Sequence, residues 1–353
     1  MHLHSAHHDI THGPLMLIAA LLFGGLLLTT PAAAVTTLTY ASNGPEQSVR
    51  GYDEKLFLDE IEKQSQGRIK VQAFWANTLV TGNEILKAVS DGVADMGFIN
   101  ANFYPKAMPY CNAIALNAFG PTTGEKTVAL YHELFEKIPA LTEEFKRHRQ
   151  LPVYFFATDC NSFTSGKELH SLAQLKGMKA RASSRWKLAD FKALGATPVS
   201  IPWSECYMAL QTGTVETIVT SVESQYRGRL YEVAPHLWVW DKMWLGIPYI
   251  ISINQKKFNK LSREDQEAIL RAGRVASEKF AKKFDTVTAG EIADMEKAGV
   301  KVLHATDKDY AEWQALPSIE ENFRVWLDEA QKAGLKDAEQ NLNKIREIVN
   351  SYL

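Results

Sequence analysis

Three side chains between Leu175 and Ser221 have the chemistry and the spacing to bind an anion. Arg181, Trp203 and Thr220 each fall at or just past the end of a short predicted strand. An arginine guanidinium presents a planar fork of N–H donors that suits a carboxylate. We therefore expect a crevice that grips an organic anion. Thr220 and Ser221 are open between two roles, ligand contact and hydrogen bonding to nearby backbone.

The same stretch predicts the elements that must position these side chains. Gly177 marks a turn before the strand that carries Arg181, and a helix then runs to Gly195. The pattern goes on with a strand ending at Pro202–Trp203, a helix over Ser204–Thr212 and an apolar strand through Val215–Val219. Such alternation predicts a wound α/β sheet, in which residues past the carboxyl ends of strands face the ligand.

The first hundred residues after position 34 predict the same order of elements. Strands are expected at Leu38–Ala41, Ile69–Phe74 and Ala94–Ile99, and helices at Ser48–Ser65 and Gly82–Ser90. A second α/β lobe follows from this repetition. Asn43, Trp75 and Asn100 lie just beyond its strands and could line the wall that faces Arg181.

The connections between the lobes can also be predicted. Two apolar runs, Val153–Ala157 and Leu245–Ile253, predict strands where the chain crosses between the lobes. A helix over Glu125–Lys146, broken at Pro139, precedes the first crossing. Ser262 then begins a helical pattern that continues to Ala298, and Ser262 with Asp265 predicts a capping box. At 1.5 Å per residue this helix would be roughly 55 Å long and would span both lobes.

Composition excludes several classes of function. The 353 residues carry a formal net charge of −2, without the basic blocks that indicate nucleic-acid binding. Cys111, Cys160 and Cys206 lie far apart, which disfavours a structural zinc site. A Cys111–Cys160 bridge stays open beside the commoner case of isolated thiols.

Residues 1–34 predict a signal peptide. The apolar run Leu15–Leu28 is short for a membrane span and suits a signal-peptide core. Ala32–Ala34 supply small residues for cleavage before Val35. The absence of Lys and Arg before the apolar run departs from the usual pattern. We expect the remaining chain to be soluble and exported.

Motifs for catalysis are absent from the sequence. It contains no GxSxG, HExxH, GxxxxGK[ST] or GxGxxG, and the five histidines after residue 34 are scattered. We therefore expect a binding protein without a cofactor rather than an enzyme. A periplasmic hydrolase whose triad is assembled only in space is the least favoured alternative.

Several short segments together resemble a known family. They are Gly67–Val71, Gly92–Met96, Leu175–Arg181, Phe191–Pro198, Glu205–Gly213, Tyr231–Val233 and Leu261–Gln266. No segment is specific alone, but in this order and spacing they resemble the periplasmic solute-binding subunits of TRAP transporters, the DctP-like group. The resemblance covers almost all of the chain after residue 34.

The resemblance implies an α/β, two-lobed periplasmic-binding-protein (Venus-flytrap) fold with a long helix spanning both lobes. It also implies a monomer in the periplasm that closes around a small organic carboxylate and delivers it to small and large membrane permease subunits. The expected lobe I is residues 35–157 plus about 246–283, and lobe II is 158–245 plus about 284–353. A ligand-sensing protein coupled to a receptor would use the same fold and stays as an alternative.

The resemblance also assigns roles to residues. Arg181 matches the family arginine that pairs with the ligand carboxylate, and Trp203 stands where an aromatic wall is usual. Thr220 occupies a position that is often Asn and contacts the ligand. Asn161 falls near a place where many members carry a second arginine, so the resemblance favours a monocarboxylate over a C4-dicarboxylate.

Overall fold

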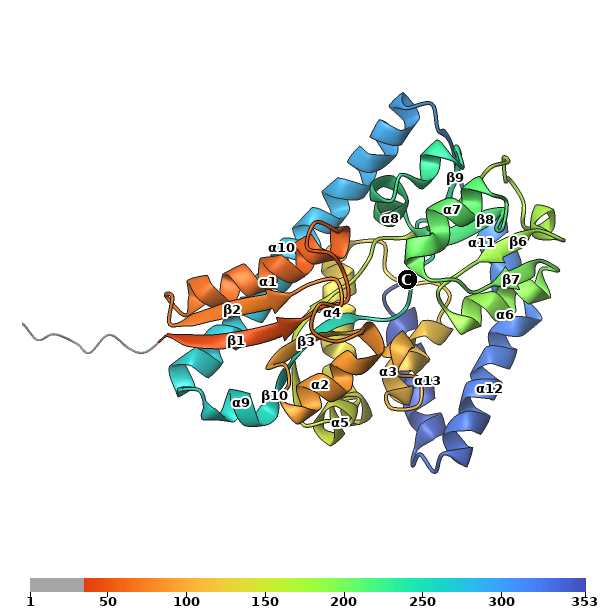
Figure 1. Ribbon diagram of the computed structural model, residues 1–353. Coiled ribbons are helices and arrows are strands. Elements are labelled where there is room, and N and C mark those ends of the chain that lie inside the picture. The colour runs from red at the N-terminus through yellow and green to blue at the C-terminus, as the bar shows by residue number, and fades with distance from the viewer. Residues whose placement is uncertain (1–34) are drawn as a thin grey trace, which may run out of the picture. The chain divides into compact units, whose positions relative to one another are not determined.

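The computed structural model describes residues 35–353, except for the side chain of Asp285. The predicted signal peptide, residues 1–34, lies outside the described residues. The fold is mixed α/β with two sheets, as predicted, and Figure 1 shows helices packed around each sheet. None of the described helices is long and apolar enough to cross a bilayer.

The first sheet has the strand order β2-β1-β3-β10-β4. Its strands are β1 Thr36–Ala41, β2 Ile69–Phe74, β3 Met96–Ile99, β4 Gln150–Phe156 and β10 Tyr249–Asn254. The first three are parallel, and β10 runs antiparallel to both β3 and β4. Because β10 is reversed, its first residue lies at the same edge as the carboxyl ends of β1, β2 and β3.

The second sheet has the order β11-β9-β5-β8-β6-β7. Its strands are β5 Asn161–Ser165, β6 Lys179–Arg181, β7 Thr197–Val199, β8 Thr217–Ser221, β9 His236–Val239 and β11 Lys301–His304. Strand β6 is parallel to β7 and β8, and β5 is antiparallel to β8. The prediction that β7 ends at Pro202–Trp203 is wrong, because Ile201 turns its carbonyl toward Arg181 instead of continuing the ladder. Strand β8 also begins and ends two residues later than predicted.

The helices of the first half follow from local capping. Ser48 caps α1, Val49–Gln64, by accepting from the Gly51 N–H, and Gly67 supplies the left-handed backbone after it, with φ of +80°. Pro139 separates α4 from α5, as predicted. The remaining elements are η1 Gly82–Glu84, α2 Ile85–Asp91, η2 Ala101–Phe103, α3 Pro109–Ala113, η3 Ile114–Leu116, α4 Gly124–Lys137 and α5 Pro139–Arg147.

The second sheet is surrounded by shorter helices. They are η4 Leu172–Leu175, α6 Arg185–Ala193, η5 Trp203–Glu205, α7 Cys206–Gln211, α8 Val222–Arg227 and η6 Leu230–Glu232. The core beside this sheet is unusually aromatic, with Phe163, Trp240 and Trp313 in mutual ring contact and almost fully buried. The three cysteines are free, so the Cys111–Cys160 bridge does not form.

The chain passes three times between the two sheets. It leaves the first sheet at β4 and enters the second at β5, it returns from β9 to β10, and it reaches the second sheet again at β11. The remaining elements are α9 Gln255–Lys260, α10 Arg263–Lys297, α11 Asp307–Gln314, α12 Pro317–Lys332 and α13 Ala338–Asn350. Helix α12 packs on α6 beside the second sheet, whereas α13 packs on α3 and α4. The lobe boundaries themselves stay a prediction.

Helix α10 contacts elements of both sheets (Figure 1). It packs on α1, α4 and β4 near the first sheet and on α8 and β11 near the second. Ser262 caps it by accepting from the Asp265 N–H, and it ends before Gly299, both as predicted. In a full capping box the Asp265 side chain would also accept from the Ser262 backbone N–H. Here the Asp265 carboxylate accepts from Arg68 instead, at 2.9 Å.

Candidate functional site

One edge of the second sheet gathers four of the predicted site residues. Arg181 is the last residue of β6, and Thr220 and Ser221 end the neighbouring strand β8. Asn161 begins β5 directly opposite Ser221. These residues are far apart in sequence, and the parallel pairing of β6 with β8 brings them to one edge, as the wound α/β pattern predicts.

Arg181 is buried without a carboxylate partner. The residue is 5% exposed, and its Nε and Nη2 both donate to the Ile201 carbonyl, at 3.4 and 3.2 Å. Among residues 35–353 no Asp or Glu forms an ion pair with it. Burial lowers its pKa, while Cys206 and Tyr249 raise it. Because a guanidinium keeps its proton in proteins, Arg181 is an uncompensated buried cation.

The three neighbours of Arg181 differ in what they can offer a ligand. Ser221 is occupied, because its Oγ accepts from the Ser224 N–H and donates to the Ser224 hydroxyl at the start of α8. Of the two roles expected for Ser221, the structure shows hydrogen bonding to nearby backbone. Its hydroxyl therefore has little hydrogen-bonding capacity left for a ligand. The side chains of Asn161 and Thr220 make no hydrogen bond within the described chain, although Asn161 is only 4% exposed.

Trp203 does not lie in an enclosed wall in this structure. It begins η5 and is 43% exposed. Its ring covers Gly228, where an added Cβ would lie 2.9 Å from the indole Cζ2. Trp203 still follows Ile201, the partner of Arg181, by only two residues, so it lies at the rim of the Arg181 site.

The first sheet presents the other three predicted residues at its own carboxyl edge. Asn43 follows β1, Trp75 follows β2 and Asn100 follows β3. Asn100 is buried and caps η2, because its side chain accepts from the Asn102 N–H. Trp75 packs edge-on against Tyr40. Asn43 accepts a hydrogen bond of 2.8 Å from Arg50.

Arg50 is a functional candidate that sequence reasoning missed. It lies in the first turn of α1, with Nε 2.6 Å from the Glu54 carboxylate and its guanidinium carbon 3.9 Å from the Phe98 ring centroid. Glu54 is fully buried and also accepts from the Tyr40 hydroxyl at 2.6 Å. A cation in the first helical turn opposes the helix dipole. That unfavourable placement is the one signal in the sequence that could have marked it.

Tyr249 connects the two sheet edges. It is the first residue of β10 and packs edge-on against Phe98, with ring centroids 5.1 Å apart. Burial raises the pKa of Tyr249, and the positive charges of Arg50 and Arg181 both act to lower it. The phenol of the first sheet therefore lies within the electrostatic reach of the buried arginine of the second. We refer to Arg181, Tyr249 and Arg50 together as the inter-sheet site.

The sequence matches a known family of bacterial proteins. The sequence model of the family described as "Bacterial extracellular solute-binding protein, family 7", DctP, matches residues 40–321. The chain belongs to this family. Family 7 comprises the extracytoplasmic solute-binding proteins of TRAP transporters, which bind small organic acids and work with membrane permease subunits. They are receptors rather than enzymes.

Relatives and solved structures are similar to the chain over most of its length. It is 24% identical to the 2,3-diketo-L-gulonate-binding periplasmic protein YiaO of Escherichia coli K12, over 82% of this chain and 88% of that protein. Its fold matches a TRAP periplasmic solute-binding protein of Desulfovibrio salexigens with a TM-score of 0.78, at 23% identity, covering 90% and 97% of the two chains. A second protein of that species, with bound orotic acid, matches at a TM-score of 0.76, 18% identity and coverages of 90% and 99%. These similarities confirm the two-lobed fold.

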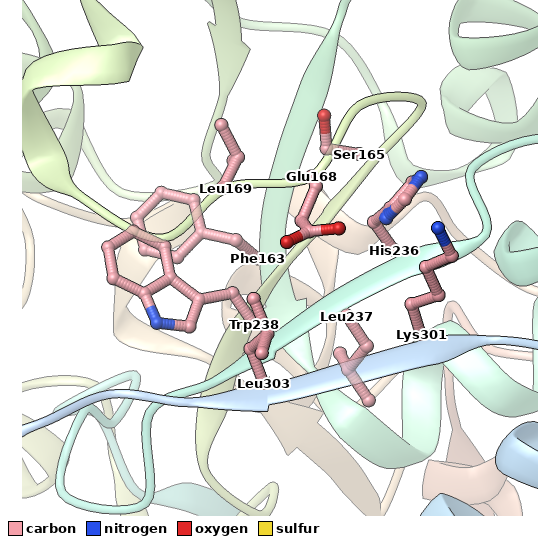
Figure 2. A pocket seen from close by; sticks show the side chains of 9 residues that line it. All are labelled: Phe163, Ser165, Glu168, Leu169, His236, Leu237, Trp238, Lys301 and Leu303. Atoms are coloured by element: carbon pink, nitrogen blue, oxygen red, sulfur yellow. The ribbon is translucent and has the colours of Figure 1, made fainter.

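A separate shallow hollow, with no space for a water molecule, lies beside β5, β9 and β11 of the second sheet. Figure 2 shows Glu168 with the rings of Phe163 and Trp238 on one side and His236 and Lys301 on the other. Strand β8 lies between this part of the sheet and β6, which carries Arg181. Within residues 35–353 no group of three or more His, Cys, Asp or Glu is arranged to hold a metal ion.

Proposed function

We propose that this chain is the periplasmic solute-binding subunit of a TRAP-type transporter and that Arg181 grips the carboxylate of one small organic acid. The observation that carries the proposal is the burial of Arg181 with a single carbonyl partner and no counter-charge in the described chain. A buried guanidinium without an anion is costly, and a ligand carboxylate would supply the missing charge. The acids in the names of the relatives, 2,3-diketo-L-gulonate and orotic acid, support the class of ligand.

Closure of two lobes is the proposed mechanism of capture. The lobes are those predicted from the sequence, 35–157 plus about 246–283 and 158–245 plus about 284–353. An acid bound at Arg181 would also reach Tyr249 and Arg50 of the first sheet. A ligand that contacts both sheet edges only in the closed arrangement shifts the population toward it. Small and large permease subunits would then recognise the closed form.

The decisive experiment is a thermal-shift and calorimetric screen of carboxylic acids against the purified protein. Each acid is paired with its uncharged amide, which keeps the size and removes the charge. We expect acids to raise the melting temperature and their amides to leave it unchanged. Amides that bind as tightly as the acids would contradict the proposal. Small-angle scattering with the best acid tests closure, because an unchanged radius of gyration would contradict a closing motion.

A further inference from the structure

The two arginines of the inter-sheet site differ in their electrostatic partners. Among residues 35–353, Arg181 has only a peptide carbonyl as its hydrogen-bond partner. Arg50 has Glu54 at 2.6 Å, and its Nη2 donates to Asn43 at 2.8 Å. The site therefore contains one arginine with a built-in counter-charge and one without.

Glu54 is fixed in its role as the counter-charge of Arg50. Its side chain is fully buried, and its second oxygen accepts from the Tyr40 hydroxyl at 2.6 Å. Burial raises the pKa of Glu54, whereas Arg50 and the Tyr40 hydrogen bond lower it. The positive charge of a guanidinium 2.6 Å away favours the ionised form of the Glu54 carboxyl. The Arg50–Glu54 pair therefore has no net charge.

Arg50 nevertheless keeps donor capacity. Its guanidinium lies flat on the Phe98 ring, 3.9 Å from the centroid, and its side chain is 18% exposed. Its Nη1 donates to no acceptor among residues 35–353. Gly44 lies close against it, because an added Cβ on this glycine would be 2.2 Å from Arg50 Nη2. Arg50 is thus a positioned hydrogen-bond donor with its charge already neutralised.

The remaining titratable groups add no charge to the site. Burial raises the pKa of Tyr249 and of Cys206, so both are neutral at physiological pH. Burial also raises the pKa of Tyr40. Asp53, the neighbour of Glu54 in α1, is paired with Lys283 at 2.9 Å. Of the three residues of the inter-sheet site, Arg181 is therefore the one whose charge is not balanced within the described chain. One carboxylate of a ligand is enough to balance it.

We propose that the inter-sheet site selects a monocarboxylate that carries a neutral oxygen acceptor, a hydroxyl or a carbonyl, at a distance from its carboxylate, and that Arg50 donates to this acceptor. This inference rests on the proposed function and specifies the ligand class. A second carboxylate at Arg50 would be buried beside Glu54 without a counter-charge, which is strongly unfavourable. An unsubstituted acid would leave the Arg50 donor unpaired, which costs binding free energy as well.

The test uses two matched sets of three acids, measured by calorimetry at pH 8. One set is hexanoate, gluconate and glucarate, and the other is benzoate, 3-hydroxybenzoate and isophthalate. We expect the hydroxylated monoacid to bind most tightly in the set that fits the site, by about tenfold over the other two members. Tightest binding by the diacid or by the unsubstituted acid would overturn the inference and leave the proposed function intact. Binding of no member would overturn both.

Two variants test the assignment to Arg50 itself. Glu54→Gln keeps the shape and an acceptor for Tyr40 but removes the counter-charge, so it should raise the affinity for the diacid relative to the monoacid by about tenfold. Arg50→Gln should abolish the preference for the hydroxylated acid and retain binding of the unsubstituted one through Arg181. If Glu54→Gln does not fold, Arg50→Gln decides alone. An unchanged order of affinities in Arg50→Gln would overturn the inference.

Discussion

Buried Arg181 and partly exposed Arg50 show how partner groups decide what an arginine side chain can do. Arg181 and Arg50 have the same chemistry, and both influence the pKa of Tyr249. The Arg50 guanidinium is engaged within the protein by an ion pair with Glu54, a hydrogen bond to Asn43 and a cation–π contact with the Phe98 ring. Arg181 has only the Ile201 carbonyl and is therefore the residue whose charge is available to a ligand.

Replacement of Arg181 should separate binding from stability. Arg181→Met removes a buried cation without a counter-charge, so the ligand-free protein should melt at the same temperature as the parent or higher. Acid binding should weaken by about 2–5 kcal/mol, and Arg181→Lys should weaken it too, because a point charge cannot replace the planar fork. Calorimetry and thermal unfolding measure the two effects.

Arg185→Lys is the matched control for the Arg181 variants. Arg185 is exposed on α6 and pairs with Glu329 at 2.6 Å, outside the inter-sheet site. Its replacement should leave acid binding and melting temperature nearly unchanged. Full binding by Arg181→Met would show that the carboxylate is held elsewhere.

The contrast between the two arginines also shows what the sequence could predict. Arg181 could be predicted because a lone cation ends a short strand of a wound α/β pattern. Arg50 offered only the weak signal of a cation in the first turn of a helix, because its spacing from Glu54 is that of an ordinary exposed pair. The burial of Glu54, which accepts a hydrogen bond from Tyr40, becomes visible only in the structure. Likewise, nothing in the sequence shows that Ser221 caps α8 or that Trp203 stays 43% exposed.

Elements were predicted best where capping and turn residues mark their ends. Ser48, Gly67 and Ser262 set the bounds of α1 and the start of α10 as expected. The end of β7 was misplaced because the apolar residue Ile201 extends the strand pattern, whereas its carbonyl is used by Arg181. The long helix could be predicted from its uninterrupted pattern, but its closest contact, at Gly273, could not.

Two glycines in α10 make a matched test of that contact. An added Cβ at Gly273 would lie 1.8 Å from the Val153 carbonyl oxygen of β4, whereas one at Gly290 would meet nothing within 4 Å. Gly290→Ala should stabilise the fold by about 0.5–1 kcal/mol through helix propensity. Gly273→Ala should destabilise it by about 1–3 kcal/mol, because α10 must move away from β4. Urea unfolding measures both, and equal effects of the two substitutions would contradict the close packing.

At the scale of the whole molecule, buried carboxyl groups join elements of both sheets. Lys283 of α10 lies 2.9 Å from Asp53 of α1 and 3.5 Å from Glu223 of α8. Asp159, between β4 and β5, accepts from the Glu223 N–H at 3.0 Å and from Thr288 at 2.9 Å, and its other oxygen has no partner in the described chain. Burial raises the pKa of Asp53 to about 7, and burial together with Glu223 raises the pKa of Asp159 to about 8.

These raised pKa values predict that the whole fold loses stability as pH rises. From about pH 4 up to pH 7 for Asp53 and pH 8 for Asp159, the folded chain holds protons on these groups that the unfolded chain has released. Unfolding then releases protons, so a higher pH favours it, and above about pH 8 the effect levels off. The melting temperature should therefore fall between pH 5 and pH 8. Asp159→Asn keeps an acceptor for Thr288 and removes the titration. It should flatten this slope and raise stability at pH 8 by about 2–4 kcal/mol.

Asp328→Asn serves as the control for that slope. Asp328 pairs with Lys332 on the exposed face of α12 and lies away from the junction of α1, α8 and α10. Its removal should leave the pH dependence of the melting temperature unchanged. A melting temperature that rises from pH 5 to pH 8, or a slope that Asp159→Asn does not reduce, would show that the junction is hydrated and its carboxyl groups are ionised. Asp53 lies on α1 and Asp159 lies in the crossing from β4 to β5, so ionised groups at both positions would mean that protonated carboxyl groups do not stabilise the contact between these elements.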